Sequence, residues 1–191
     1  MTAAAPLIVG IGGTTRAGST TELALLHALS HAEQAGCRTR AFGSAELPTE
    51  PYDPSNPDRS ERALALVDAL RHADGVLIAT PCYHGGVSGL MKNAIDFAED
   101  LRTDARPYLQ GRAVGCIVCA EGPQAFGPTL SALRDIVHAL RGWPTPYGAA
   151  LNTTGRPFGP DGMGTGGVAR QACERVAGEV MSFARLMAGA R

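Results

Sequence analysis

The 191-residue sequence lacks any excess of one charge. Its 17 basic and 18 acidic side chains give a formal net charge of -1, and Lys and Arg form no run or stripe. Nucleic acids and anionic membrane surfaces are bound through such basic stripes, so neither is expected as a partner. No apolar stretch approaches the roughly 20 residues of a membrane helix, and the apolar run 7–11 lacks the preceding basic residues of a secretory signal. We therefore expect a cytoplasmic protein that acts on small molecules.

The cysteines lack the pattern of a secreted disulfide scaffold, because there are five of them at irregular spacings. Cys116 and Cys119 do form a C-x-x-C spacing, which occurs in metal and redox sites. They lie in an apolar run typical of a strand, where residues three apart face opposite sides. We therefore expect two separately buried side chains, and no metal site. The other candidate metal ligands are four histidines on predicted helices, and their spacing is not that of metal ligands: His27, His31, His72 and His138.

The sequence also lacks internal repeats and low-complexity tracts. Strand-like and helix-like segments alternate along it. The length suits one domain spanning residues 1–191. The predicted strands are 7–12, 38–42, 75–80, 112–120 and 146–151, and the predicted helices are 20–35, 57–72, 89–101, 129–140 and 167–187. Segments 43–56 and 152–167, rich in Pro and Gly respectively, are predicted surface loops.

Five nearly continuous apolar strands separated by helices predict a parallel sheet covered on both faces. The flavodoxin-like strand order 2-1-3-4-5, an α/β three-layer sandwich, is the natural arrangement for five strands. Ligands of such sheets bind beyond the carboxyl ends of the strands, at the switch point between strands 1 and 3. The loops 12–19 and 81–88 follow these two strands, so both are predicted to border the ligand site.

The first of these loops has the composition of an anion site. Ser19 and Glu22 form a capping box, which starts a helix and directs its free N–H groups and positive dipole end toward the loop. Arg16 adds a cationic fork suited to phosphate oxygens. Hydroxyl groups supply further donors: Thr14, Thr15, Ser19, Thr20 and Thr21. The dinucleotide and NTP-binding motifs fail at their later positions, so the loop predicts a phosphomonoester site.

The second loop has the composition of a binding surface for a flat ligand. Pro81 is predicted to open a turn, and three glycines, Gly85, Gly86 and Gly89, allow the main chain to approach a ring closely. Tyr83 and His84 offer flat side chains with polar tips. The following helix carries one apolar stripe, typical of a core-facing or subunit-facing helix: Leu90, Ala94, Phe97 and Leu101.

The pattern Gly-x-x-Arg-x-x-Ser with Thr20, followed by Thr-Pro-x-Tyr-x-Gly-x-x-Ser-Gly-x-x-Lys-Asn-x-x-Asp at 80–96, resembles the NADPH-dependent FMN reductase family. Segment 120–127 takes the place of that family's third flavin loop, with Glu121 and a Pro where the family often has Ser or Thr and paired glycines. The resemblance implies bound FMN. Its phosphate would be held by Thr14, Arg16, Ser19, Thr20 and Thr21, and its ring would lie along Pro81, Cys82, Tyr83, His84, Gly85, Glu121 and Gly122.

What the resemblance implies is an oxidoreductase in which NADPH or NADH passes a hydride to the flavin N5 and no side chain acts as acid or base. The electrons would go to free flavin for a partner monooxygenase, or to a quinone, chromate or azo compound. Arg102 and Arg106 are candidates for the 2'-phosphate of NADPH. Members of the family usually form homodimers or homotetramers, with the helix after the second loop in the interface.

Two alternatives belong to other classes. A flavodoxin-type electron carrier would bind FMN without oxidising a nicotinamide, but the net charge of -1 and Arg16 both argue against it. A hydrolase or transferase would use Cys82 as nucleophile and His84 as base. Side chains two residues apart on a loop rarely reach that geometry without a third, orienting group.

Overall fold

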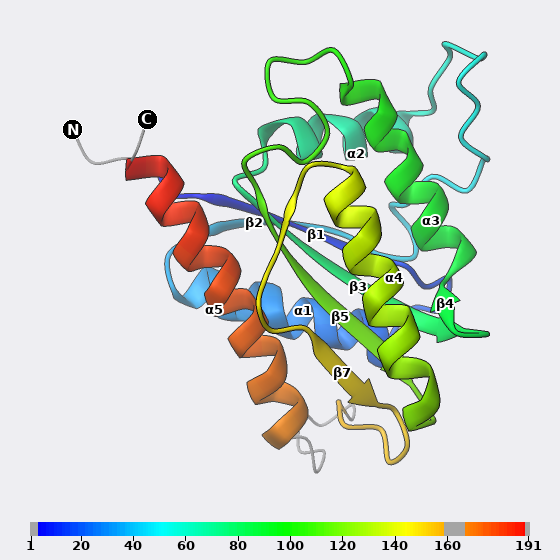
Figure 1. Ribbon diagram of the computed structural model, residues 1–191, viewed down its shortest axis with the longest axis vertical. Coiled ribbons are helices and arrows are strands. Elements are labelled where there is room, and N and C mark those ends of the chain that lie inside the picture. The colour runs from blue at the N-terminus through cyan, green and yellow to red at the C-terminus, as the bar shows by residue number, and fades with distance from the viewer. Residues whose placement is uncertain (1–3, 159–166, 190–191) are drawn as a thin grey trace.

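A computed structural model describes residues 4–158 and 167–189. Its parallel strands β1 (Leu7–Gly12), β2 (Arg38–Phe42), β3 (Gly75–Tyr83) and β5 (Ala113–Ala120) lie side by side in the order β2-β1-β3-β5 (Figure 1). Two short strands, β6 (Trp143–Pro144) and β7 (Ala149–Asn152), both pair with β5. The predicted flavodoxin-like order is thus confirmed, with the fifth position divided between two strands.

Helices cover both faces of this sheet. On one face lie α1 (Thr20–Gln34) and α5 (Gly167–Gly189), and on the other lie α2 (Glu61–His72), α3 (Gly89–Asp96) and α4 (Phe126–Ala139). Each face has its own hydrophobic core. Cys116 belongs to the core under α2, α3 and α4, whereas Cys119 belongs to the core under α1 and α5. The predicted opposite orientation of this pair is therefore confirmed.

The end of β3 differs from its prediction. The strand does not stop at Thr80, since Pro81 pairs with Cys119 of β5 and the next two residues pair antiparallel with β4 (Gly86–Val87). The turn lies at His84 and Gly85, whose φ angles of 53° and 80° are those of a type I' hairpin turn. Pro81 is therefore a strand residue, and the prediction that it opens the turn was wrong.

Two helix ends also differ from their predictions. Helix α2 begins at Glu61 instead of residue 57, because the Ser60 side chain caps it by accepting a hydrogen bond from the Ala63 N–H at 3.2 Å. Helix α3 ends at Asp96 and continues as the 3-10 helix η1 (Phe97–Leu101). Within the predicted apolar stripe of this region, Ala94, Phe97 and Leu101 are buried in the chain's own core.

The two predicted loops are irregular in their described parts except at the ends of the second, since Asn152 is the last residue of β7 and Gly167 is the first residue of α5. Segment 43–56 is irregular throughout, and so are residues 153–158 of the second loop. Residues 159–166 of that loop lie outside the described residues. No helix in the described parts of the chain is long and apolar enough to cross a membrane.

Candidate functional site

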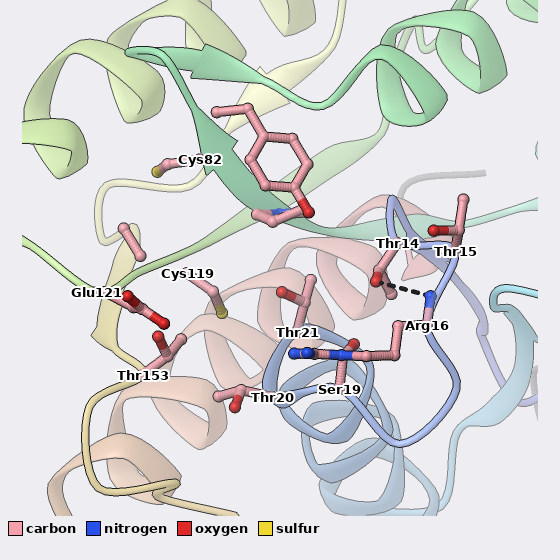
Figure 2. Close-up of a pocket in the computed structure, with 13 residues that line it drawn as sticks. Thr14, Thr15, Arg16, Ser19, Thr20, Thr21, Cys82, Cys119, Glu121 and Thr153 are labelled. Carbon is pink, nitrogen blue, oxygen red and sulfur yellow. Dashed lines mark hydrogen bonds between the residues drawn. The ribbon is translucent and has the colours of Figure 1, made fainter.

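A cavity of about 490 Å³ lies at the carboxyl edge of the sheet, where the loops after β1, β5 and β7 meet the last residues of β3 (Figure 2). Parallel strands all end at this edge, which is why loops far apart in sequence come together there. The cavity is lined by Thr14, Thr15, Arg16, Ser19, Thr20, Thr21, Pro81, Cys82, Tyr83, Cys119, Ala120, Glu121 and Thr153.

The first loop is folded by local hydrogen bonds around the start of α1. Ser19 caps the helix, since its Oγ accepts from the Glu22 N–H at 3.3 Å. A capping box also predicts that the Glu22 carboxylate accepts from the Ser19 N–H, and this detail is wrong. The carboxylate accepts from the Gly18 N–H at 2.6 Å, because the Ser19 N–H donates to the Arg16 carbonyl instead. The same carboxylate accepts from the Ser44 N–H at 3.3 Å and so anchors the next loop.

Unused donors converge at this helix start. The backbone N–H groups of Thr20 and Thr21 donate to no acceptor among the described residues, as is typical of a first helical turn. The guanidinium of Arg16 extends over the same helix end (Figure 2). The hydroxyls of this loop and the helix dipole complete an environment that favours an anion.

Ser88 ties the first loop to the second. Its buried hydroxyl donates to the Gly13 carbonyl at 2.6 Å and accepts from the Met91 N–H at 3.1 Å, which caps α3. The Ser88 N–H in turn donates to Thr80 Oγ1 at 3.1 Å. The first loop approaches α3 so closely that a Cβ at Gly13 would lie 2.5 Å from the Met91 Cβ. The Ser88 side chain therefore helps to hold the first loop in place relative to the second.

The opposite wall is formed by the ends of β5 and β7. Residue Ala120 pairs with Asn152, and the Thr153 N–H donates to the Ala120 carbonyl at 2.9 Å. This pairing places Thr153 beside Glu121, across the cavity from Arg16 (Figure 2). The wall thus ends in a hydroxyl and a carboxylate, whereas the first loop ends in donors and a cation.

Most of the predicted site residues line the cavity, and three do not. His84 and Gly85 form the hairpin turn beyond its rim, and Gly122 lines an adjoining hollow. Sequence analysis missed Cys119, Ala120 and Thr153 as lining residues, and it named Thr15 only as a hydroxyl donor. The first two could have been found by taking the last residues of the strand along with its loop. Thr153 has no sequence signal, because its place depends on how β7 pairs with β5.

The cavity offers no activated thiol. Burial raises the pKa of Cys119 to about 12 and also raises the pKa of Cys82, so both remain protonated at neutral pH. The Cys82 Sγ donates to the Ala125 carbonyl at 3.6 Å, and no hydrogen bond joins it to His84 within the described chain. The arrangement therefore lacks the nucleophile and base of a hydrolase.

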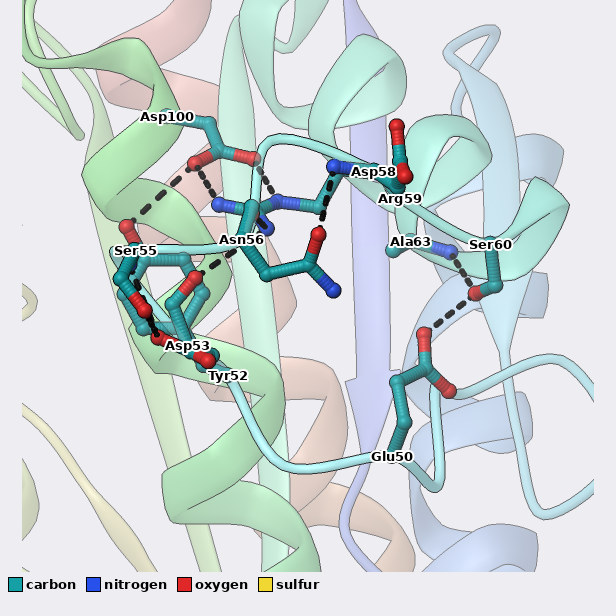
Figure 3. Close-up of polar contacts among 10 residues, drawn as sticks. All are labelled: Glu50, Tyr52, Asp53, Ser55, Asn56, Asp58, Arg59, Ser60, Ala63 and Asp100. Atoms are coloured by element: carbon teal, nitrogen blue, oxygen red, sulfur yellow. Dashed lines mark hydrogen bonds and ion pairs between the residues drawn. The ribbon is translucent and has the colours of Figure 1, made fainter.

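A second polar cluster, away from the cavity, has a structural role (Figure 3). The Arg59 guanidinium donates to both carboxylate oxygens of Asp100, at 2.7 and 2.8 Å, and lies 4.9 Å from the ring centre of Tyr52. The hydrogen bond from Arg59 lowers the pKa of Asp100. Asn93 also holds this segment, since its Oδ1 accepts from the Tyr52 N–H at 2.8 Å. These contacts fasten the segment before α2 onto α3 and η1.

Comparison with known proteins identifies the family of this chain. The sequence profile of the NADPH-dependent FMN reductase family matches residues 6–155, which include every residue of the cavity. This chain belongs to the NADPH-dependent FMN reductase family. It is therefore an NAD(P)H-dependent flavin oxidoreductase that uses FMN.

Relatives and solved structures agree with this family. An FMN-dependent NADPH-azoreductase of Staphylococcus aureus is 29% identical over 155 residues, which cover 78% of this chain and 79% of that protein. An oxidoreductase from Corynebacterium diphtheriae has a TM-score of 0.70 at 19% identity, covering 95% and 98% of the two chains. FerB from Paracoccus denitrificans, an NAD(P)H:acceptor oxidoreductase, has a TM-score of 0.65 at 24% identity, covering 96% and 97%. At these identities the two structures support the fold alone.

The cavity of this FMN reductase family member fits its cofactor at the phosphate end. A phosphomonoester needs several hydrogen-bond donors and a cation, which are what the start of α1 and Arg16 supply. The positions of Arg102 and Arg106 do not support the predicted contacts of these two residues with NADPH. Arg106 donates to the Ala73 carbonyl, just before β3 begins, and Arg102 follows η1. Both lie at the amino edge of the sheet, away from the cavity of their own chain.

Proposed function

We propose that this family member holds FMN in the cavity as a bound cofactor and uses NAD(P)H to reduce a small organic acceptor. The observation that carries the proposal is the polarity of the cavity, in which free N–H groups, hydroxyls and Arg16 gather at one end and strand ends form the walls at the other. Such a cavity orients a phosphorylated planar molecule, and neither of its two thiols, Cys82 and Cys119, is an activated nucleophile.

The residues have distinct parts in this proposal. The N–H groups of Thr20 and Thr21, the hydroxyls of the loop and the Arg16 guanidinium bind the phosphate. Pro81, Tyr83 and Glu121 border the ring, and Ser88 sets the distance between the two loops. When bound, FMN supplies the hydride chemistry, accepting two electrons from the nicotinamide and passing them on. The protein contributes binding and orientation, so no residue is assigned as catalytic.

An azo compound is the first acceptor to test. The Staphylococcus aureus relative is an FMN-dependent NADPH-azoreductase, and its match covers 78% of this chain. A second candidate is free FMN supplied to a partner monooxygenase, which the name of the family favours. Quinones and chromate remain alternative acceptors on the same bound FMN.

The remaining proposals concern the setting of the enzyme. We place it in the cytoplasm as one domain spanning residues 1–191. We also propose a homodimer or homotetramer with the outward side of α3 in the interface. That side carries the Lys92–Asp96 ion pair, at 2.6 Å, since the apolar stripe of the helix packs inside the chain. Light scattering after size-exclusion chromatography measures the oligomeric state, and a monomer would refute this assignment.

Purification followed by an acceptor assay tests the function. We expect a yellow protein that releases FMN on denaturation and oxidises NADPH or NADH when an azo dye, a quinone or free FMN is present. A higher rate with the azo dye than with free FMN supports the first candidate. A colourless protein that takes up no added FMN would refute the proposal.

A further inference from the structure

A second hollow of about 480 Å³ adjoins the cavity. It is bordered by the end of β5 and by the 3-10 helix η2 (Pro123–Ala125). The two hollows share three lining residues, Cys82, Ala120 and Glu121. A molecule in the second hollow would therefore lie beside the cavity wall opposite the phosphate site.

Charge is unevenly distributed over these two hollows. Among the described residues that line them, Arg16 and Glu121 are the only ones with a formal charge at neutral pH. Arg16 lies at the first loop, where the phosphate is proposed to bind. The Glu121 side chain is exposed, and no basic side chain of the described residues lies within ion-pair distance of it. Its negative charge is thus directed at the space that the two hollows share.

We propose that Glu121 is a specificity-determining residue, whose carboxylate makes the enzyme favour cationic over anionic electron acceptors in the second hollow. The inference rests on the proposed function, since it requires FMN in the first cavity. Its physical basis is the repulsion between like charges and the attraction between opposite ones. In bulk water, an opposite unit charge about 4 Å away strengthens binding by about fivefold, and a like charge at the same distance weakens it by about fivefold.

The test compares acceptors of matched size and opposite charge. The wild-type holoenzyme is assayed at low salt with two quinones, one carrying a sulfonate and one a quaternary ammonium group. We expect kcat/KM to favour the cationic quinone by about 10-fold or more, and Glu121→Gln to reduce this preference to less than about threefold. Glu121→Lys should reverse it. At about 1 M salt the wild-type preference should disappear, because the screening length is then only about 3 Å.

A binding measurement separates recognition from turnover. Benzenesulfonate and benzyltrimethylammonium are not reducible, and each is titrated against the absorption spectrum of the bound flavin. Their ratio of dissociation constants should change with Glu121→Gln in the same direction as the kinetic ratio. Glu99→Gln is the matched control, because Glu99 pairs with Arg102 at 3.7 Å, away from both hollows, and its loss changes the net charge equally. The Glu99→Gln variant should show the same ratio of dissociation constants as the wild type.

The outcomes are distinguishable. If wild type and Glu121→Gln both retain FMN but show the same charge preference, the inference is wrong and the proposed function stands. An equal change in Glu99→Gln would also overturn the inference, since the effect would then come from net charge. A wild-type protein that binds no FMN overturns both.

Discussion

Replacing Ser88 by Ala removes a side chain that joins the two loops of the cavity. The Ser88 hydroxyl has two roles, because it donates to the Gly13 carbonyl at 2.6 Å and accepts from the Met91 N–H at 3.1 Å. Both partners are buried, so water cannot replace the lost contacts without a local rearrangement. The substitution creates almost no change in volume, which isolates the hydrogen bonds.

The expected loss in the free energy of unfolding is the sum of two contributions. Loss of a helix cap costs about 1 kcal/mol, and an unsatisfied buried carbonyl costs about 1–3 kcal/mol. Ser88→Ala should therefore lower the free energy of unfolding by about 2–4 kcal/mol. Ser60→Ala is the matched control, since Ser60 caps α2 in the same way but has no contact with the first loop. It should cost about 1 kcal/mol.

Urea unfolding of the FMN-free proteins measures both costs, and flavin fluorescence measures the FMN dissociation constant. We expect Ser88→Ala to weaken FMN binding by about 10-fold, which corresponds to about 1.4 kcal/mol, because the first loop loses its hydrogen bond to the Ser88 side chain. Ser60→Ala should leave FMN binding within about twofold of wild type. If Ser88→Ala and Ser60→Ala have equal unfolding free energies and equal FMN affinities, the assigned link between the loops is wrong.

Three further predictions concern the phosphate site, the Asp100 cluster and the thiols. Arg16→Gln should weaken FMN binding by about 10- to 100-fold while leaving the affinity for riboflavin, which lacks the phosphate, unchanged; equal losses for both ligands would contradict the phosphate assignment. Asp100→Asn should cost about 1–3 kcal/mol at neutral pH. Because Arg59 lowers the pKa of Asp100 below its usual 3.8, this contribution is complete above that pH and is lost as the pH falls through the lower folded value. The two proteins should therefore converge in acid, and a difference that persists in thermal unfolding there would refute the pairing. Alkylation at pH 8 followed by mass spectrometry should modify Cys82, which is partly exposed, before the thiols whose pKa burial raises to about 12: Cys116, Cys119 and Cys173. Faster labelling of any of these three would contradict their burial.

Much of the architecture was predictable because it depends on local patterns. Continuous apolar runs predict strands covered on both faces, and five such strands separated by helices favour the flavodoxin-like sheet order. The Ser19 cap followed from the residues of one helical turn. Boundaries were less predictable, since they depend on partners: β3 continues past Thr80 only because β5 and β4 pair with it. The positive φ of His84 is another such case, because a hairpin turn requires it.

The sequence by itself determined which loops carry the hydrogen-bond donors and the residues that we propose to border the ring, because these groups are neighbours along the chain. Tertiary structure alone decided what stands opposite them. Thr153 and Glu121 share a wall because β7 pairs with β5, and Arg102 and Arg106 are excluded from that wall because they lie at the other edge of the sheet. A sequence fixes the order of side chains, whereas the pairing of distant strands sets which charges face one another across a cavity.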